Sequence, residues 1–304
     1  MSVKTLFSIK DLENLSGVKA HTIRIWEKRY HLLEPQRTDT NIRQYDVAGL
    51  KRLLNVSFLY HKGYKISKIA NFKESEINGL IQEIGEQDIE HHALQSFKAA
   101  MFDFDHYLFS KTYQELLKHK SFTTIFYDVF IPLLSDIGTL WQTGTIDPAH
   151  ERFISEIVKQ EIIVNIHAIQ QKRKERIVPK FALFLPYEEI HEIGLLFANY
   201  EILAAGFNTI YLGNNIPMES LKHLLKHYQS LIFLSYFTVK PDHESVWEYM
   251  ARFNTEIGSQ KNSAHQLWLM GSKIQQLKTK GLPKNVSIIY SLKELNQLLK
   301  TFES

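Results

Sequence analysis

The chain has 304 residues, 44% of them hydrophobic and 12% aromatic, which suits two or three domains that each bury a core. It contains no cysteine, which excludes disulfides, cysteine-ligated zinc and a thiol nucleophile, and its net charge of +3 means that any nucleic-acid contact needs a local basic surface. No apolar run approaches the roughly 20 residues of a membrane span and no signal segment opens the chain, so we expect no membrane contact and a cytoplasmic protein.

Residues 1–75 have the pattern of a winged helix-turn-helix DNA-binding domain. Ser8 caps a first helix, Ser16-Gly17-Val18 forms a tight turn, and a second helix is expected over 20–30. A wing follows over 32–45. The side chains expected to contact double-stranded operator DNA are His21, Thr22, Arg24, Lys28, Arg37, Arg43 and Tyr45. Near the helix start, His21 and Thr22 should read bases, whereas Arg24 and Arg43 should contact phosphates.

Residues 76–176 predict a bundle of four amphipathic helices joined by short loops. The third helix should run over 122–141, with Pro132 bending it. From helical spacing alone, Trp141 is a core residue and Glu151 an acid that complements the dipole of the fourth helix. The charged run 171–176 is interpreted as a solvated helix end or linker.

Residues 177–304 alternate between strand and helix patterns. Strands are expected over 181–185, 208–212, 231–235, 266–270 and 286–290, and helices over 192–205, 217–228, 243–255, 272–280 and 291–302. This alternation predicts a parallel five-stranded sheet in the flavodoxin-like (Rossmann-type) order. No glycine-rich phosphate loop follows the first strand, which argues against a dinucleotide. The whole chain is therefore expected to be a multidomain protein with α and α/β parts.

The loop after the first strand reads Glu189-x-His191-x-x-Gly194. Ligands of open α/β sheets bind at the carboxyl ends of strands, and neutral imidazole is a common metal ligand that a nearby acid can orient. The same residues also suit a surface histidine in an acidic helix-start loop. Both interpretations remain open from these residues alone.

The head closely resembles the MerR family of transcriptional regulators over about 70 residues. One departure is Ile25, where that family commonly has tyrosine. The matching positions are Ile9, Gly17-Val18, Thr22-Ile23-Arg24, Trp26-Glu27, Leu33, Pro35, Arg43, Tyr45, Gly63 and Ile69.

The sheet resembles the cobalamin-binding fold, whose motif is Asp-x-His-x-x-Gly. The resemblance implies that His191 ligates cobalt, that Glu189 orients it, and that Gly194 lies close to the corrin. It also implies that Ser235 and Gly271 line the pocket for the nucleotide tail. The preceding bundle looks like the helical cap over the corrin, with Trp141 and Glu151 at matching positions.

This order of domains resembles the CarH and LitR group of light-responsive repressors, which implies adenosylcobalamin as cofactor and a homo-oligomer, dimer or tetramer, on operator DNA. Four departures concern the cofactor: Glu189 for aspartate, Gln142 and Arg152 for histidine, and Ser272 for glycine. The alternatives are a regulator whose sheet binds another ligand or only oligomerises, and a corrinoid methyltransferase component. We expect a regulator and not an enzyme, because the chain begins with a DNA reader and has no substrate barrel.

Overall fold

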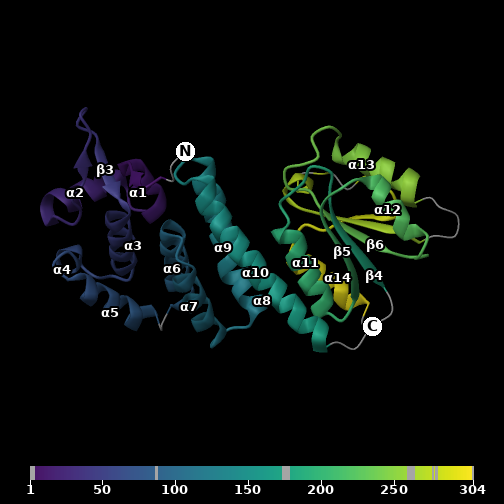
Figure 1. Ribbon diagram of the computed structural model, residues 1–304, viewed down its shortest axis with the longest axis horizontal. Helices are drawn as coiled ribbons and strands as arrows, with labels where there is room; N and C mark the ends of the chain where they lie inside the picture. The colour runs from purple at the N-terminus through teal and green to yellow at the C-terminus, as the bar shows by residue number, and fades with distance from the viewer. Residues whose placement is uncertain are drawn as a thin grey trace. The chain divides into compact units, whose positions relative to one another are not determined.

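The computed structural model describes residues 4–85, 88–172, 179–258, 264–275, 277 and 280–302. It consists of two compact units, residues 1–157 and 158–304, and each is described by itself (Figure 1). The division between them falls within helix α10. The three-domain division at 75/76 and 176/177 stays a prediction, and most of the charged run 171–176 lies outside the described residues.

The helix-turn-helix forms where the sequence predicts it. Ser8 and Asp11 make a reciprocal capping box at the start of α1, and Gly17, at φ 72°, ends that helix in the left-handed conformation. Ile23 and Trp26 of the second helix are buried. The elements of the head are β1 Leu6–Phe7, α1 Ile9–Ser16, α2 Ala20–Tyr30, β2 Gln36–Arg37, β3 Arg43–Asp46, α3 Val47–His61 and α4 Ile66–Ile69, and the strands pair in the order β1-β3-β2.

The bundle helices follow, and Pro132 interrupts the third of them as expected. A π-helical turn over 126–130 precedes this proline, which has no N–H to continue the hydrogen-bond ladder. Stacked and tilted rings of Phe97, Phe109 and Phe130 fill the core. The elements are α5 Glu74–Gly85, α6 Ile89–Asp103, α7 His106–Leu117, α8 Phe122–Ile125, the π-turn Phe126–Phe130, α9 Ile131–Gln142 and α10 Pro148–Lys172.

The second unit is built on a parallel sheet in the order β5-β4-β6-β7-β8, which confirms the predicted topology. One apolar cluster joins this sheet to α11 and α14, and a second joins its other face to α12 and α13 (Figure 1). The strands are β4 Lys180–Pro186, β5 Asn208–Ile216, β6 Ile232–Tyr236, β7 Gln266–Met270 and β8 Val286–Ile288. The helices are α11 Ile193–Ala204, α12 Met218–Leu225, α13 Val246–Phe253 with a π-turn Asn254–Gly258, and α14 Leu292–Thr301.

The helix predicted over 272–280 is wrong as far as the described residues go. Only a 3-10 turn, Ser272–Ile274, forms there, and residues 276, 278 and 279 lie outside the described part. The backbone of Lys273 donates to the carbonyl of Phe237 at 3.0 Å, so a tertiary contact fixes this segment against its helical propensity.

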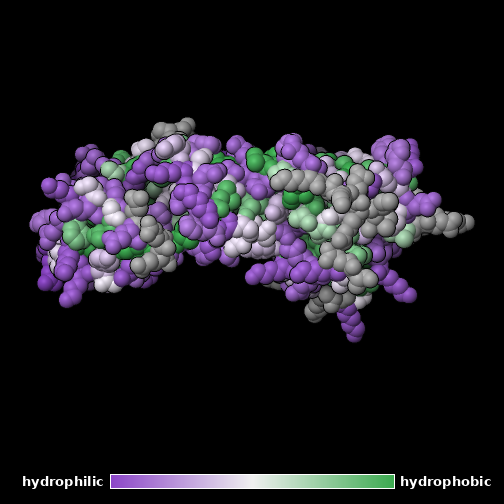
Figure 2. Space-filling view, turned by 90° about the horizontal axis from the view of Figure 1, so that it is seen from below, coloured by the Kyte–Doolittle hydropathy of each residue, from purple (hydrophilic) through white to green (hydrophobic). Residues whose placement is uncertain are grey.

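On the face seen in Figure 2, hydrophilic side chains cover most of the surface and apolar residues appear in small separate groups. Within the described ranges, no helix is both long and apolar enough to cross a membrane.

Candidate cofactor site and nucleic-acid interface

The Glu189 carboxylate is the centre of the loop that follows β4. Its side chain is fully buried, and each oxygen accepts three hydrogen bonds. Oε1 accepts from the backbone N–H of Ile190 (2.9 Å) and His191 (3.0 Å) and from Nδ1 of His191 (2.6 Å). Oε2 accepts from the backbone N–H groups of residues 238 (3.1 Å), 239 (2.7 Å) and 240 (2.8 Å), which follow β6. The one carboxylate therefore joins two loops at neighbouring strand ends.

These donors keep Glu189 ionised. Burial alone would raise the pKa of this carboxyl group, but the hydrogen bonds from His191 and from the backbone of Lys240 and Val239 outweigh it and lower the pKa well below its usual value of 4.5. A negative charge enclosed by N–H groups is thus a permanent part of the site at neutral pH.

His191 is held but exposed. Because its Nδ1–H donates to Glu189, the neutral ring carries its lone pair on Nε2, and the side chain is 52% exposed. An imidazole with a fixed ring plane, a fixed tautomer and an accessible face is the arrangement that metal-ligating histidines require. Across the described ranges, no group of three or more His, Asp or Glu side chains could hold a metal ion by itself.

Further contacts fix the His191 loop to its neighbours. The backbone N–H of Asn215, near the end of β5, donates to the carbonyl of Glu189 at 3.2 Å. Glu192 forms an ion pair with Lys159 of α10 (3.0 Å) and accepts from Nδ2 of Asn214 (2.8 Å). The histidine therefore stands on a loop that is tied to three other segments of its unit.

The space beside the start of α11 is filled by an aromatic ring. A Cβ atom on Gly194 would lie only 2.7 Å from Cε1 of Tyr236, so glycine is required here by the tyrosine ring. The sequence interpretation assigned this glycine to a close approach of the corrin. In the structure the close approach is made by Tyr236.

The tail-pocket role of Ser235 and Gly271 stays a prediction, and the structure shows what surrounds each residue. Ser235 is fully buried, and its Oγ has no hydrogen-bond partner among the described residues. Strand alternation places it on the side of Phe233 and Phe237, opposite Tyr236. Gly271, at φ 111°, is where a Cβ would meet the carbonyl oxygen of Phe237 at 2.3 Å, so backbone packing explains this glycine.

The departure at Ser272 is accommodated by the fold. Its hydroxyl donates to the carbonyl of Thr238 at 2.8 Å. The serine side chain thus stabilises the loop at residues 238–240, whose N–H groups bind Glu189.

In the first unit, the residues expected to cap a corrin are on the surface. Trp141, in the last turn of α9, is 52% exposed, so the interpretation of this tryptophan as a core residue is wrong. Glu151 lies in the first turn of α10 and accepts from the hydroxyl of Ser155 at 2.6 Å. Gln142 is exposed, and Arg152 pairs loosely with Glu151 at 3.7 Å.

The turn after Trp141 is bonded to the helix-turn-helix domain. Nζ of Lys4 donates to the carbonyls of Gly144 and Thr145, each at 3.1 Å, and Nδ2 of Asn14 donates to the buried hydroxyl of Thr145 at 2.9 Å. The backbone N–H of Lys4 also bonds Asp147. We call residues 143–147 the cap turn. The first helix of the DNA-binding head therefore touches the segment between Trp141 and Glu151.

The predicted base and phosphate contacts share one face of α2. His21, Arg24 and Lys28 recur at helical spacing and are exposed, opposite the buried Ile23 and Trp26. Thr22 is half-buried. Arg37 is exposed at the tip of the wing and donates to Oδ1 of Asn41 at 2.7 Å.

Glu27 joins the recognition helix to the wing. It accepts from Nε of Arg43 at 3.0 Å and from the hydroxyl of Tyr45 at 2.9 Å. Arg43 remains 32% exposed, so it can still face a phosphate. Tyr45 is 2% exposed, which corrects its expected role as a DNA contact: its ring packs in the core and its hydroxyl supports Glu27.

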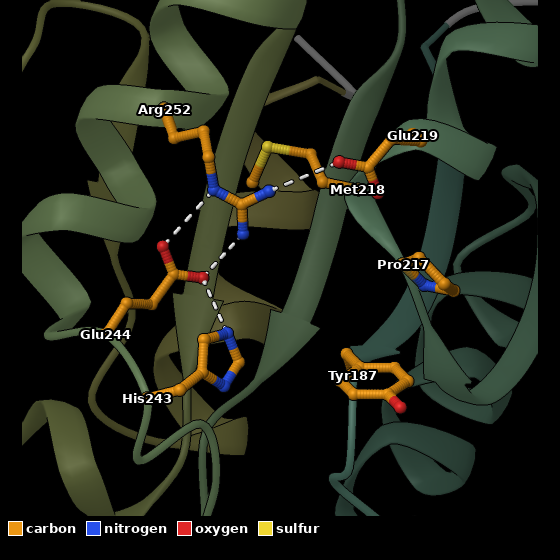
Figure 3. A pocket seen from close by; sticks show the side chains of 7 residues that line it. All are labelled: Tyr187, Pro217, Met218, Glu219, His243, Glu244 and Arg252. Atoms are coloured by element: carbon orange, nitrogen blue, oxygen red, sulfur yellow. Dashed lines mark hydrogen bonds and ion pairs between the residues drawn. The ribbon is translucent and has the colours of Figure 1, made fainter.

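The second unit also has an open pocket of about 380 Å³ on its α12 and α13 side. Figure 3 shows the Arg252 guanidinium between two carboxylates, bonded to Glu244 (2.5 and 3.2 Å) and 3.7 Å from Glu219. The lining residues are Tyr187, Pro217, Met218, Glu219, His243, Glu244 and Arg252. None of the predicted site residues lines this pocket, and its charges are already paired.

Sequence reasoning missed three features of these sites. The backbone donors at 238–240 leave no trace in side-chain identity, and Glu27 was noted only as a family match. Tyr236 had a signal: it ends the strand next to β4, at the edge where α/β sheets bind ligands.

The chain matches two known families, one over the DNA-binding head and one over the bundle helices, and the loop of Glu189 and His191 lies outside both matched regions. Residues 7–76 match the MerR HTH family regulatory proteins, and residues 93–164, which span the bundle helices, match the B12 binding domain. The chain is 33% identical over 225 residues to the HTH-type transcriptional repressor CarH of Myxococcus xanthus, covering 71% of this chain and 73% of that relative.

Two further likenesses are more limited. The HTH-type transcriptional regulator MlrA of Salmonella typhimurium is 32% identical over 95 residues, 30% of this chain and 38% of that one. The monomethylamine corrinoid protein of Methanosarcina barkeri superposes with a TM-score of 0.52 at 14% identity, over 67% of this chain and 96% of that one, which shows a shared fold.

These findings define a transcriptional regulator with a MerR-type DNA-binding head and a B12-binding domain. More narrowly, the chain belongs to the CarH family of helix-turn-helix repressors, which are DNA-binding regulators and not enzymes.

The enclosed Glu189 charge predicts an acid-dependent stability. Because its pKa is lower in the folded than in the unfolded protein, Glu189 stabilises the fold above about pH 4.5, and this contribution is lost as the pH falls toward the folded-state pKa. Glu189→Gln should cost on the order of 3 kcal/mol at pH 7, because an amide nitrogen would face N–H donors.

Urea unfolding at pH 7 and at about pH 3 measures this effect. The difference between wild type and Glu189→Gln should shrink at the lower pH, while Glu188→Gln, at the exposed neighbouring residue, should follow wild type at both. An equal difference at the two pH values would show that Glu189 is not a buried charge.

Proposed function

We propose that the protein is a cobalamin-controlled repressor that binds operator DNA, and that His191 is the lower axial ligand of cobalt. The observation that carries this proposal is the exposed His191 ring, whose Nδ1–H is fixed by the buried Glu189 carboxylate at a strand end. The match to the B12 binding domain and the similarity to the repressor CarH support it.

The donor set suits a metal that already has other ligands. A corrin supplies four nitrogens to cobalt, so the protein needs to add only one, and the described residues offer one oriented imidazole. Glu189 fixes the orientation and the tautomer of the His191 ring. Trp141 and Glu151, which the sequence resemblance assigns to the helical cap, are proposed as further cofactor contacts.

The cofactor form proposed is adenosylcobalamin, whose cobalt–carbon bond light can break, and the signal would then be light. Because Gln142 stands where some light sensors have a cobalt-ligating histidine, the state after illumination should lack a second protein ligand. A homo-oligomer, dimer or tetramer, fits a family in which head pairs read two-fold related half-sites. The location proposed for this function is the cytoplasm, because its target is operator DNA.

On DNA, α2 would enter the major groove, with His21 and Thr22 near its start reading base edges. Arg24 and Lys28 on the same helix and Arg37 and Arg43 on the wing would contact phosphates. Glu27 would hold Arg43 in place for that contact, since it accepts from Nε and leaves the rest of the guanidinium toward solvent.

The cap turn offers a route from the cofactor to the DNA. It follows Trp141 directly and is bonded to Lys4 and Asn14 of the head. A cofactor that shifts Trp141 would therefore change contacts made by α1, the helix packed against the recognition helix. Through this link, cobalamin could shift the equilibrium between two conformations of the DNA-binding head.

The His191 assignment is tested by loading the full-length protein with adenosylcobalamin in the dark and dialysing it. Wild type should retain the cofactor with a histidine-ligated absorption spectrum. His191→Ala should lose that spectrum and bind at least about tenfold more weakly, because one coordinate bond is removed.

The matched control is His227→Ala, an exposed histidine in the segment between α12 and β6. It should behave as wild type. The proposal fails if wild-type protein retains no cobalamin, or if His191→Ala keeps both its affinity and its spectrum.

The cap-turn route predicts a second result. Asn14→Ala and Thr145→Val each remove one side of the same hydrogen bond, so each should reduce the factor by which cobalamin changes operator affinity. The double variant should reduce it no further, since the two residues share one contact. Operator titrations with and without cobalamin in the dark measure this factor.

Asn55→Ala is the control, because Asn55 lies in the same head but bonds Asn78 of α5. Its coupling factor should equal that of wild type. A coupling factor left unchanged by both cap-turn variants would show that the signal takes another route.

A further inference from the structure

The order of the strands in the sheet defines where a ligand is expected to bind. The chain passes from β4 to β5 on one side and later reaches β6 on the other, so the crevice at the carboxyl ends of β4 and β6 is the switch point of the sheet. The His191 loop follows β4, and Tyr236 ends β6. The tyrosine therefore stands in the crevice that this topology gives to a ligand.

The next step rests on the proposed ligation by His191. Cobalamin has a nucleotide tail on the lower side of its corrin, and the base of that tail can itself bind the lower position of cobalt. When His191 takes that position, the displaced tail must be received by the protein on the side of His191. Gly194, three residues later, lies in the first turn of α11.

The ring of Tyr236 already lies there. A Cβ on Gly194 would be 2.7, 3.0 and 3.2 Å from Cε1, Cζ and Cδ1 of that ring, so the ring packs directly on the glycine backbone. Tyr236 is half-buried and packs against the apolar cluster between the sheet and helices α11 and α14. The ring and an inserted tail cannot share this space.

The backbone around Tyr236 is fixed on both sides. Tyr236 pairs in register with Met270, and the N–H of Phe237 donates to the Met270 carbonyl at 2.8 Å. The next three N–H groups bind Glu189. Only rotation of the side chain can therefore clear the crevice, at the cost of the ring's contacts with the cluster.

We propose that Tyr236 is the residue that sets corrinoid specificity, by closing the tail crevice. A corrinoid without a nucleotide tail can reach His191 while the ring stays in place. Cobalamin must first displace the ring, so its affinity is lowered by the free energy of that displacement. Because side-chain rotation is fast, this is an equilibrium penalty and not a slow step.

The test compares aquacobalamin with aquacobinamide, which has the same corrin but no nucleotide tail. Dissociation constants of both are measured in the dark by absorption titration of the full-length protein. The variants are Tyr236→Ala, which empties the crevice, Tyr236→Leu, which keeps apolar contacts with the cluster, and Tyr236→Phe, which keeps the ring. Circular dichroism verifies that each variant is folded.

Tyr236→Ala should bind aquacobalamin about tenfold or more tightly than wild type, while aquacobinamide changes by less than about threefold. Tyr236→Leu should shift in the same direction by less, and Tyr236→Phe, which keeps the ring, should shift least. The proposed role of Tyr236 would be overturned if the ratio of the two affinities stayed unchanged in Tyr236→Ala and Tyr236→Leu. Weaker binding of aquacobalamin by these two variants would also overturn it.

The two proposals fail in different ways. One outcome is that wild type binds cobalamin with a histidine-ligated spectrum while the Tyr236 variants leave the ratio of aquacobalamin to aquacobinamide affinity unchanged. In that case the role of Tyr236 is wrong and the His191 assignment stands. If no variant binds either corrinoid, both are wrong, and the sheet serves another ligand or oligomerisation.

Discussion

The burial of one carboxylate organises the candidate cofactor site. Glu189 has no exposed surface, and ionised carboxylates are tolerated in that position only when hydrogen bonds replace the lost water. Six donors do so, three from its own loop and three from the loop after β6. The orientation of His191 and the position of the chain after Tyr236 both depend on this group, so one side chain holds both loops.

The overall fold could be predicted because it is encoded in periodicity. The buried strands at 181–185 and 231–235 are continuous apolar runs, and the helices between the strands have amphipathic patterns. Because strands and helices alternate along the chain, a parallel sheet in the flavodoxin-like order could be predicted. The segment after Gly271 could not be predicted in this way. Its conformation is decided by contacts with Phe237 and Thr238, which are distant in sequence.

The sites were predictable to the extent that single side chains carry the chemistry. His191 and Glu189 were found from their spacing, and the structure brings them together at 2.6 Å. Tyr45 was misjudged because a motif match does not report burial. The cofactor roles predicted for Gly194 and Gly271 stay predictions, and the structure adds that the first lies against the Tyr236 ring and the second against the Phe237 backbone. A glycine at a motif position thus indicates that another group lies close to its backbone, but it does not show whether that group belongs to the protein or to a ligand.

Ligation of cobalt by His191 is the central claim, and the electron paramagnetic resonance spectrum of bound cob(II)alamin tests it most directly. Protein uniformly labelled with nitrogen-15 is loaded in the dark with unlabelled cob(II)alamin. A lower ligand from the protein splits each cobalt line in two, as nitrogen-15 does, whereas the cofactor's own base carries nitrogen-14 and splits each line in three. The account predicts doublets that disappear in His191→Ala. Triplets in the labelled wild-type protein would contradict it.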